Sequence, residues 1–195
     1  SSKISVLKNL LNKVDTLIVV GGMAYTFFKA KGYEIGTSLC EDDYIQTAKE
    51  IMDKAKELNK TLYLPIDNVV ADKFDNDANK KIVDCNAIPS GWMGMDVGDK
   101  TLKEIENILK NAKTIVWNGP LGVFEMSNFA KGTFETAKFI ANSGAVSIIG
   151  GGDSVSAVNK SGVADKMTHI STGGGASLEF LEGIELPGIK VLQDK

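Results

Sequence analysis

Two glycine triplets in the last quarter of the chain offer the clearest chemistry in the sequence. They are Gly150-Gly151-Gly152 and Gly173-Gly174-Gly175, and each stands between a short apolar run and a segment with helical character. A strand that ends in glycines and leads into a helix lets backbone N–H groups approach an anion without interference from Cβ atoms. The helix N-terminus adds roughly half a positive charge. The pattern predicts phosphate binding.

The residues that flank each triplet extend this interpretation. Asp153 and Ser154 directly follow the first triplet and supply a carboxylate for a metal ion and a hydroxyl for a phosphate oxygen. Ser171 and Thr172 precede the second triplet and suit the N-cap of a helix expected to begin at about Ala176. A lone triplet is more often a turn, and Asp153 alone would more often cap a helix. Two triplets with the same kind of flanks favour a ligand site.

Length and composition exclude several classes of protein. The 195 residues suit one domain with a real core, and Cys40 and Cys85 have neither disulfide nor zinc spacing, which favours a cytoplasmic location. No apolar run approaches the roughly 18 residues of a membrane span, and a net charge of −3 argues against nucleic acid as a partner. All 22 basic residues are lysine, so lysines, helix termini or a metal must hold any anion. The single histidine, His169, is expected in the core.

Apolar, β-branched runs alternate with amphipathic stretches along most of the chain. Strands are expected at 16–20, 61–65, 114–117, 145–149 and 167–170, and helices at 6–11, 23–31, 42–58, 102–109, 129–141, 155–160 and 177–181. Residues 67–95 are irregular, with short strand candidates at 69–70 and 82–83. The alternation predicts an α/β fold with a doubly wound, mainly parallel, Rossmann-like sheet and helices on both faces.

Four glycine-bearing turns fall at the carboxyl ends of the expected strands, where such sheets bind ligands. They are Gly21-Gly22, Asn118-Gly119-Pro120 and the two triplets. The dinucleotide fingerprint needs a third glycine that both triplets lack, and the P-loop needs a Gly-Lys dipeptide that the chain does not contain. The turns indicate an unusual nucleotide site. A dinucleotide-binding oxidoreductase domain and a folding unit without ligand binding remain as alternatives.

Several longer segments resemble the phosphoglycerate kinase family. They include the runs at 71–75, 89–96, 116–125, 148–154 and 169–179. The resemblance covers essentially the whole chain and corresponds to the C-terminal, nucleotide-binding half of that two-domain family, so that residues 1–195 form one domain. The N-terminal half, which in the family carries the basic patch for the phosphoglycerate, is missing. This accounts for the absence of arginine.

The resemblance implies a role for each matching residue. The adenine would lie against Gly21, Gly22, Gly94 and Met95, with Phe74 nearby, and the ribose hydroxyls against Glu125. The loop beside the phosphates would be Asn118, Gly119 and Pro120, followed toward the base by Val123 and Phe124. The phosphates would meet Gly151, Gly152 and Ser154, with Mg²⁺ held by Asp153. The phosphoryl in transfer would face Lys3, Gly173, Gly174 and Gly175.

The resemblance also implies a reaction, the transfer of a phosphoryl group between 1,3-bisphosphoglycerate and ADP with Mg²⁺. In-line transfer needs both substrates aligned across a closing cleft, and the acceptor site belongs to the missing N-terminal domain, the natural partner of this chain. The chain is therefore expected to bind Mg-ADP or Mg-ATP and to show little or no turnover by itself.

Overall fold

The apolar runs of the sequence form strands and the amphipathic stretches form helices in the computed structural model, which describes residues 2–171. The helices are α1 (Ser2–Leu10), α2 (Gly22–Ala30), α3 (Ile45–Glu57), α4 (Asp99–Lys110), α5 (Lys131–Asn142) and α6 (Gly152–Lys160). Short 3-10 turns are η1 (Asp42–Tyr44), η2 (Ser127–Phe129) and η3 (Ala164–Lys166). The strands are β1 (Thr16–Ile18), β2 (Thr61–Tyr63), β3 (Asp67–Ala71), β4 (Lys80–Asp84), β5 (Met93–Val97), β6 (Thr114–Asn118), β7 (Val146–Gly150) and β8 (His169–Ile170). The helix expected at 177–181 lies outside the described residues.

Two of the three sheets in the described part of the chain are parallel. Strand β1 pairs with β2, and β6, β7 and β8 pair in that order, with Trp117 opposite Ile149. The predicted α/β class with parallel strands and covering helices is thereby confirmed. Hydrogen bonding nevertheless divides the described parallel strands between two sheets, where the sequence predicted one.

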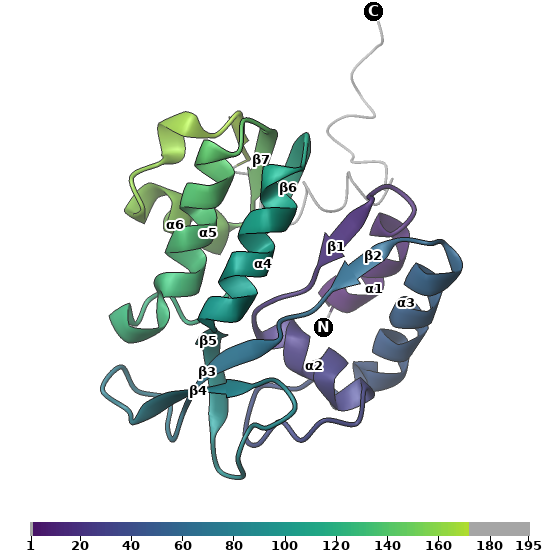
Figure 1. Ribbon diagram of the computed structural model, residues 1–195, viewed down its shortest axis with the longest axis vertical. Helices are drawn as coiled ribbons and strands as arrows, with labels where there is room; N and C mark the ends of the chain where they lie inside the picture. The colour runs from purple at the N-terminus through teal and green to yellow at the C-terminus, as the bar shows by residue number, and fades with distance from the viewer. Residues whose placement is uncertain (1, 172–195) are drawn as a thin grey trace, which may run out of the picture.

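The third sheet is antiparallel and lies beside the other two in Figure 1, with the order β4-β3-β5. It occupies the region whose sequence pattern is irregular. The candidates at 69–70 and 82–83 lie in β3 and β4, so both are confirmed. Strand β5 was not predicted, because Met93-Gly-Met-Asp-Val97 contains a glycine and a buried carboxylate and does not read as an apolar strand.

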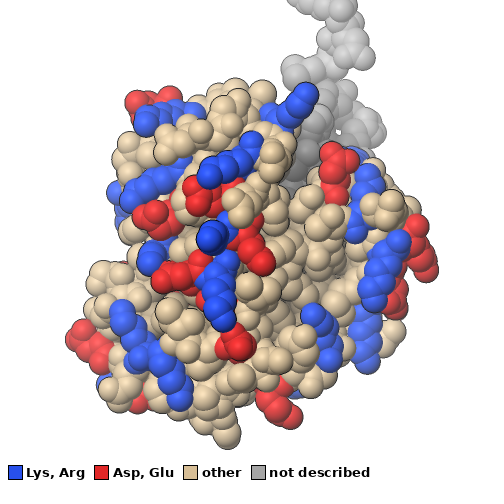
Figure 2. Space-filling view, viewed as in Figure 1, with Lys and Arg blue, Asp and Glu red and all other residues tan. Residues whose placement is uncertain are grey.

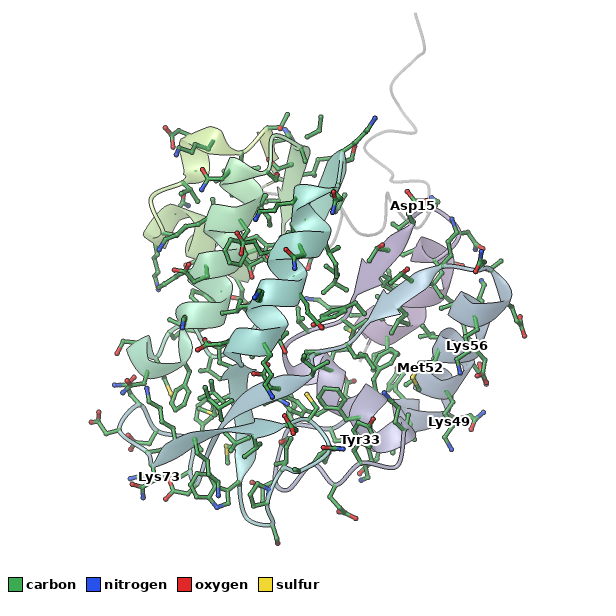
Figure 3. All side chains as sticks on the ribbon, viewed as in Figure 1. Asp15, Tyr33, Lys49, Met52, Lys56 and Lys73 are labelled. Atoms are coloured by element: carbon green, nitrogen blue, oxygen red, sulfur yellow. The ribbon has the colours of Figure 1, made fainter. Side chains whose placement is uncertain are left out.

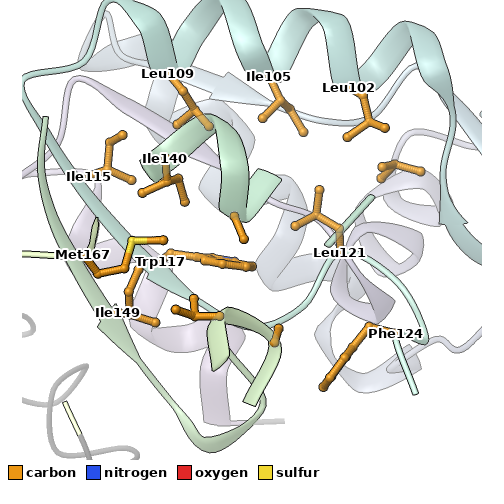
Figure 4. Close-up of a cluster of buried hydrophobic side chains, with 14 of the residues drawn as sticks. Leu102, Ile105, Leu109, Ile115, Trp117, Leu121, Phe124, Ile140, Ile149 and Met167 are labelled. Carbon is orange, nitrogen blue, oxygen red and sulfur yellow. The ribbon is translucent and has the colours of Figure 1, made fainter. Parts of the chain in front are cut away.

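One hydrophobic core lies between helices α4, α5 and α6 and the sheet β6-β7-β8. Helix α4 contributes Leu102, Ile105 and Leu109, which share one face at helical spacing, and Trp117 lies at the centre of the cluster (Figure 4). Each fully buried side chain of this kind stabilises the fold by about 1.5–3 kcal/mol. This core holds the carboxyl ends of β6 and β7 in place.

A second core joins α1, α2 and α3 to the sheet β1-β2, with Phe27 and Ile51 fully buried. The first core also contacts the β1-β2 sheet through Ile18 and Tyr63, and the Tyr63 hydroxyl donates to Glu104 of α4 at 2.7 Å. Helices therefore cover both faces of this sheet. In Figure 1, α4–α6 lie on the left and α1–α3 on the right, with β1 and β6 between the two groups of helices.

The surface carries mixed charge. Lysine and acidic side chains are interspersed on the face shown in Figure 2, without a single cationic patch. None of the helices between residues 2 and 171 is long and apolar enough to cross a membrane. The expectation that His169 belongs to the core is wrong, because this residue is exposed on the edge strand β8.

Candidate functional site

Three glycine turns follow the carboxyl ends of parallel strands and share a left-handed backbone. The φ angles are 67° at Gly21 after β1, 110° at Gly119 after β6 and 85° at Gly151 after β7. Residues with a Cβ rarely adopt these values. A Cβ on Gly21 would lie 2.7 Å from the carbonyl oxygen of Pro120, so the first two turns are in contact. The structure thus brings together three of the four turns that the sequence placed at one rim, and the fourth, at residues 173–175, lies outside the described residues.

Lys3, Asn118 and Gly151 meet on one side of this rim, which we call the phosphate side after its predicted role. The Lys3 ammonium donates to Asn118 Oδ1 at 3.5 Å, and a Cβ on Gly151 would lie 3.1 Å from the same oxygen. Helix α6 begins directly after Gly151, with Gly152 and Asp153 exposed in its first turn. A cation, an amide side chain and the N-terminus of a nine-residue helix therefore face the same space.

The Gly119 turn is held rigidly from two directions. The Ser154 hydroxyl, which is fully buried, accepts the Gly119 N–H at 2.6 Å, and the Trp117 indole donates to the Gly119 carbonyl at 2.6 Å. In the described structure, Ser154 therefore positions the turn that the sequence placed beside the phosphates. Its predicted direct contact with a phosphate oxygen stays a prediction.

Asp153 is the residue predicted to hold a metal. No group of three or more His, Cys, Asp or Glu side chains between residues 2 and 171 forms a ready metal site. An exposed carboxylate beside a turn that the sequence predicts to bind phosphate nevertheless suits Mg²⁺, which proteins commonly hold by one or two carboxylates together with substrate phosphates and water. The donor chemistry fits this ion.

A second group of predicted residues forms a strip of small and apolar groups, which we call the base side after its predicted role. A Cβ on Gly22 would lie 2.7 Å from Cδ2 of Leu39, and the neighbouring Ser38 hydroxyl accepts the Gly94 N–H at 2.9 Å. The Met95 carbonyl accepts the Val123 N–H at 2.9 Å. The strip therefore runs from Gly22 over the 38–39 loop to β5 and the turn after β6.

Leu39 is the residue of this strip that the sequence did not single out. Its side chain is 70% exposed although it is a large aliphatic group, and it lies directly against Gly22. The only indication in the sequence is a leucine within the polar loop Gly36-Thr-Ser-Leu-Cys40. That the loop folds back onto Gly22 depends on a non-local contact, which the sequence pattern does not reveal.

A side chain of the core also requires glycine at position 94. The Tyr25 hydroxyl of α2 occupies the space that a Cβ on Gly94 would take. Tyr25 also donates to Asn68 Oδ1 at 3.3 Å, and burial raises the pKa of its hydroxyl well above the ordinary value.

The nearby Cys85 thiol is buried, and desolvation raises its pKa to about 12, so it is not a nucleophile at neutral pH.

Three residues that the sequence predicted near the base or ribose, Phe124, Glu125 and Phe74, are not part of the strip. Phe124 is 5% exposed and packs edge to face on Phe134 with ring centroids 6.3 Å apart, so its ring belongs to the core of α4–α6 rather than to the surface where a base was expected (Figure 4). An aromatic ring gains more from this packing than from exposure at a turn. Glu125 is exposed. Phe74 is 63% exposed and follows Lys73, which Figure 3 labels at the outer end of the antiparallel sheet.

The predicted residues Gly173, Gly174 and Gly175 lie outside the described residues. The remaining predicted residues come from several kinds of element. Lys3 lies on α1, Gly94 and Met95 lie on β5, and Gly152, Asp153 and Ser154 lie in the first turn of α6. The arrangement provides backbone N–H groups, a lysine and a carboxylate on the phosphate side and an apolar surface on the base side.

This combination of parallel strands, covering helices and glycine turns gathered at one rim defines an α/β protein of the Rossmann-like kind, in which ligands commonly bind at the carboxyl ends of the strands. A comparison with family sequence models makes the assignment specific, because the model described as "Phosphoglycerate kinase" matches residues 1–184. The chain belongs to the phosphoglycerate kinase family.

Curated relatives and solved structures agree with this assignment. A phosphoglycerate kinase of Clostridium botulinum is 63% identical over all 195 residues, and one of Clostridium kluyveri is 62% identical. The phosphoglycerate kinase structure from Coxiella burnetii superposes with a TM-score of 0.93 at 48% identity over 97% of this chain, and that from Pyrococcus horikoshii with 0.81 at 34% over 96%. The chain spans 49% of the Clostridium relatives and 49% and 47% of the two solved chains, about half the length of each.

Proposed function

We propose that this chain is the nucleotide-binding half of a phosphoglycerate kinase and binds Mg-ADP and Mg-ATP at the rim of glycine turns. In the whole protein it would take part in phosphoryl transfer between 1,3-bisphosphoglycerate and ADP. The observation that carries the proposal is the meeting of Lys3, Asn118 and Gly151 at the N-terminus of α6. This group of residues offers positive potential and free backbone donors to phosphates.

Each side of the rim would have its own task. On the phosphate side, Gly151, Gly152 and the turn from Asn118 to Pro120 would hold the phosphates, with Lys3 as the neutralising charge. On the base side, Gly22, Leu39 and Val123 would cover the adenine, and Gly21, Gly94 and Met95 would complete the wall. The exposed carboxylate of Glu125 would accept the ribose hydroxyls.

Asp153 would hold Mg²⁺ together with the nucleotide phosphates. When bound, Mg²⁺ supplies positive charge that neutralises the transferring phosphoryl group. The chain's own residues would orient the phosphates through backbone N–H groups and leave the terminal phosphoryl facing the open side of the rim. The family resemblance also assigns Gly173, Gly174 and Gly175 to the phosphoryl in transfer, and these residues lie outside the described part of the chain.

Calorimetric titration with Mg-ATP and Mg-ADP tests nucleotide binding directly. We expect saturable heat with both nucleotides and none with NAD at the same concentration. The midpoint of thermal unfolding should also rise, because a ligand that binds only the folded chain stabilises it by about 2.7 kcal/mol at a hundredfold excess over Kd. No heat and no shift at millimolar Mg-ATP would refute the proposal, and heat with NAD alone would favour a dinucleotide-binding domain.

The metal assignment is tested by Asp153→Ala. We expect this variant to lose most of the difference in ATP affinity measured with and without Mg²⁺. The matched control is Asp165→Ala, which removes an exposed carboxylate from η3 rather than from the α6 N-terminus. A magnesium dependence that is equal in the wild type, the variant and the control would contradict the role of Asp153.

The proposal also includes the absence of turnover in this chain alone. We expect an assay with Mg-ATP and 3-phosphoglycerate to give little or no product, since a phosphoryl acceptor has to be aligned across a closing cleft. Activity comparable to that of a full-length relative would show that the chain is a complete enzyme.

A further inference from the structure

Asp96 is a buried carboxylate that none of the roles above uses. It lies on β5, it is 2% exposed, and both of its oxygens accept backbone hydrogen bonds. Asp96 Oδ1 accepts the Val97 N–H at 2.8 Å, and Oδ2 accepts the Gly132 N–H at 2.9 Å. Gly132 is the second residue of α5, whose first N–H groups have no partner within the helix. Asp96 therefore caps α5 from a distant strand.

The surroundings of Asp96 are built to let this carboxylate touch two backbone segments. A Cβ on Gly122 would lie 2.5 Å from Asp96 Oδ1, and a Cβ on Gly132 would collide with the same oxygen. The turn after β6 and the first turn of α5 thus both pack directly on the carboxylate. Any larger side chain at either glycine would push the carboxylate out of its place.

Thr133 continues the connection from α5 to the turn. Its hydroxyl is fully buried and accepts the N–H groups of Leu121 at 3.1 Å and of Gly122 at 3.4 Å. The next residue, Val123, donates to the carbonyl oxygen of Met95, the neighbour of Asp96 on β5. The turn at 121–123 is therefore attached to α5 and β5, and these two elements are joined to each other by Asp96.

We propose that Asp96 is a positioning residue of the nucleotide site: its carboxylate fixes the first turn of α5 and, through Thr133, the turn that carries Val123 and Glu125. The inference rests on the proposed function, because it assigns a task toward the base and ribose. It does not make Asp96 a ligand of the nucleotide. The carboxylate acts on the site only through the backbone of α5 and the 121–125 turn.

The ionisation state of Asp96 allows the link from Asp96 through α5 to the 121–125 turn to be tested. Burial raises its pKa to about 7, against the opposing effects of the Gly132 and Val97 N–H groups and of the Lys131 ammonium. Other charged and titratable groups surround Asp96. Lys131 of α5 pairs with Asp99 of α4 at 2.7 Å, and Glu135 lies near Lys131 on the same helix. The Tyr25 hydroxyl approaches from α2, and the 121–125 turn carries the exposed Glu125. The ionised carboxylate accepts both N–H bonds, whereas a proton on either oxygen displaces one of them.

The test follows backbone amides and adenosine binding between pH 5 and 9. Adenosine is the probe because it carries the base and ribose but no phosphate groups that titrate in this range. In the ¹⁵N-labelled wild type we expect the amide signals of Gly132, Gly122 and Val123 to titrate together near pH 7, and adenosine to bind about tenfold more tightly at pH 8 than at pH 6. Asp96→Asn should abolish the common titration and bind weakly at both pH values.

Two further variants keep the test decisive. Asp99→Asn removes an exposed carboxylate next to Lys131 and should preserve the pH profile. Thr133→Val removes the acceptor of Leu121 and Gly122 without touching Asp96, so it should lower adenosine affinity about tenfold at both pH values while Gly132 still titrates. It also serves if Asp96→Asn fails to fold.

The outcomes separate this inference from the proposed function. If the wild type binds neither adenosine nor Mg-ATP, the nucleotide site itself is refuted, and the role of Asp96 with it. If both ligands bind but the pH profile of adenosine affinity is flat in the wild type, or Thr133→Val binds like the wild type, the positioning role alone is overturned and the nucleotide site stands.

Discussion

On the phosphate side of the proposed site, glycine turns at the ends of parallel strands present backbone N–H groups, and a lysine and a carboxylate are added at the edge. On the base side, the surface is made of side chains and turns that an antiparallel sheet and a buried aspartate hold in place. The phosphate side depends on local backbone conformation, since Gly119 and Gly151 both have positive φ. The base side depends on contacts between segments far apart in the chain, such as Asp96 with Gly132.

This difference has a consequence for stability. A turn that needs glycine costs the protein backbone entropy, but it buries no charge. Asp96, by contrast, keeps a carboxylate almost completely out of water in order to hold two N–H groups. On the base side, the buried charge of Asp96 lowers the stability of the fold while its hydrogen bonds position the site. A rise in pH through the pKa of Asp96 should therefore lower stability and strengthen the positioning.

The largest expected effect is the change in stability with pH that Asp96 contributes. Its pKa is raised from an ordinary value of 3.8 to about 7, so its contribution to stability is fully present below pH 4 and is lost as the pH rises through 7. With 1.36 kcal/mol per pKa unit, the free energy of unfolding of the wild type relative to Asp96→Asn should fall by about 4 kcal/mol between pH 4 and pH 8. Urea denaturation at several pH values measures this difference, and parallel pH curves for the two proteins would contradict it.

The second effect concerns the contact between the Gly21 turn of the base side and the 118–120 turn of the phosphate side. Gly21→Ala should destabilise the fold by about 2–3 kcal/mol, because the residue has φ of 67° and its new Cβ would press on the Pro120 carbonyl. Gly162→Ala is the control, since it has φ of 73° but open space around the position, and it should cost about 1 kcal/mol. Chemical denaturation compares them, and equal losses would mean that the contact between the two turns carries no energy.

A smaller effect is expected for the bond that ties α6 to the Gly119 turn. Ser154→Ala leaves the Gly119 N–H without its acceptor and should lower the free energy of unfolding by about 1–2 kcal/mol. Mg-ADP affinity should fall as well, because the turn beside the phosphates is released. Ser156→Ala, on the same helix but only half-buried, should change stability by less than about 0.5 kcal/mol. If both variants behave alike, the turn does not need this anchor.

The smallest effect on stability should come from Leu39. Because its side chain is 70% exposed, Leu39→Ser should change the free energy of unfolding by less than about 0.5 kcal/mol. Adenosine affinity should nevertheless drop about fivefold, as an apolar surface over the base is lost. Ile82→Ser alters another exposed aliphatic residue, which lies on the edge strand β4, and should leave adenosine affinity unchanged. Wild-type affinity in Leu39→Ser would remove this residue from the base side.

Much of the fold follows from patterns that are local in the chain. The amphipathic spacing of Leu102, Ile105 and Leu109 predicts α4, and the apolar run 114–117 predicts β6. Strand β5 escaped prediction because Asp96 is acidic and Gly94 is a poor strand former, and both are accommodated only by tertiary partners. The division into separate sheets likewise depends on pairing between distant strands.

By itself, the sequence determined the positions of the glycine turns, the alternation of strands and helices, and the family to which the chain belongs. They depend on single residues and on the spacing of residues within short segments, because a glycine permits a positive φ and a run of spaced apolar residues gives one apolar face. The tertiary structure alone decided that Leu39 lies against Gly22, that Phe124 turns into the core and that Asp96 is buried against α5. Burial and hydrogen bonding between distant segments depend on how the elements pack, and packing is not written in any short stretch of the chain.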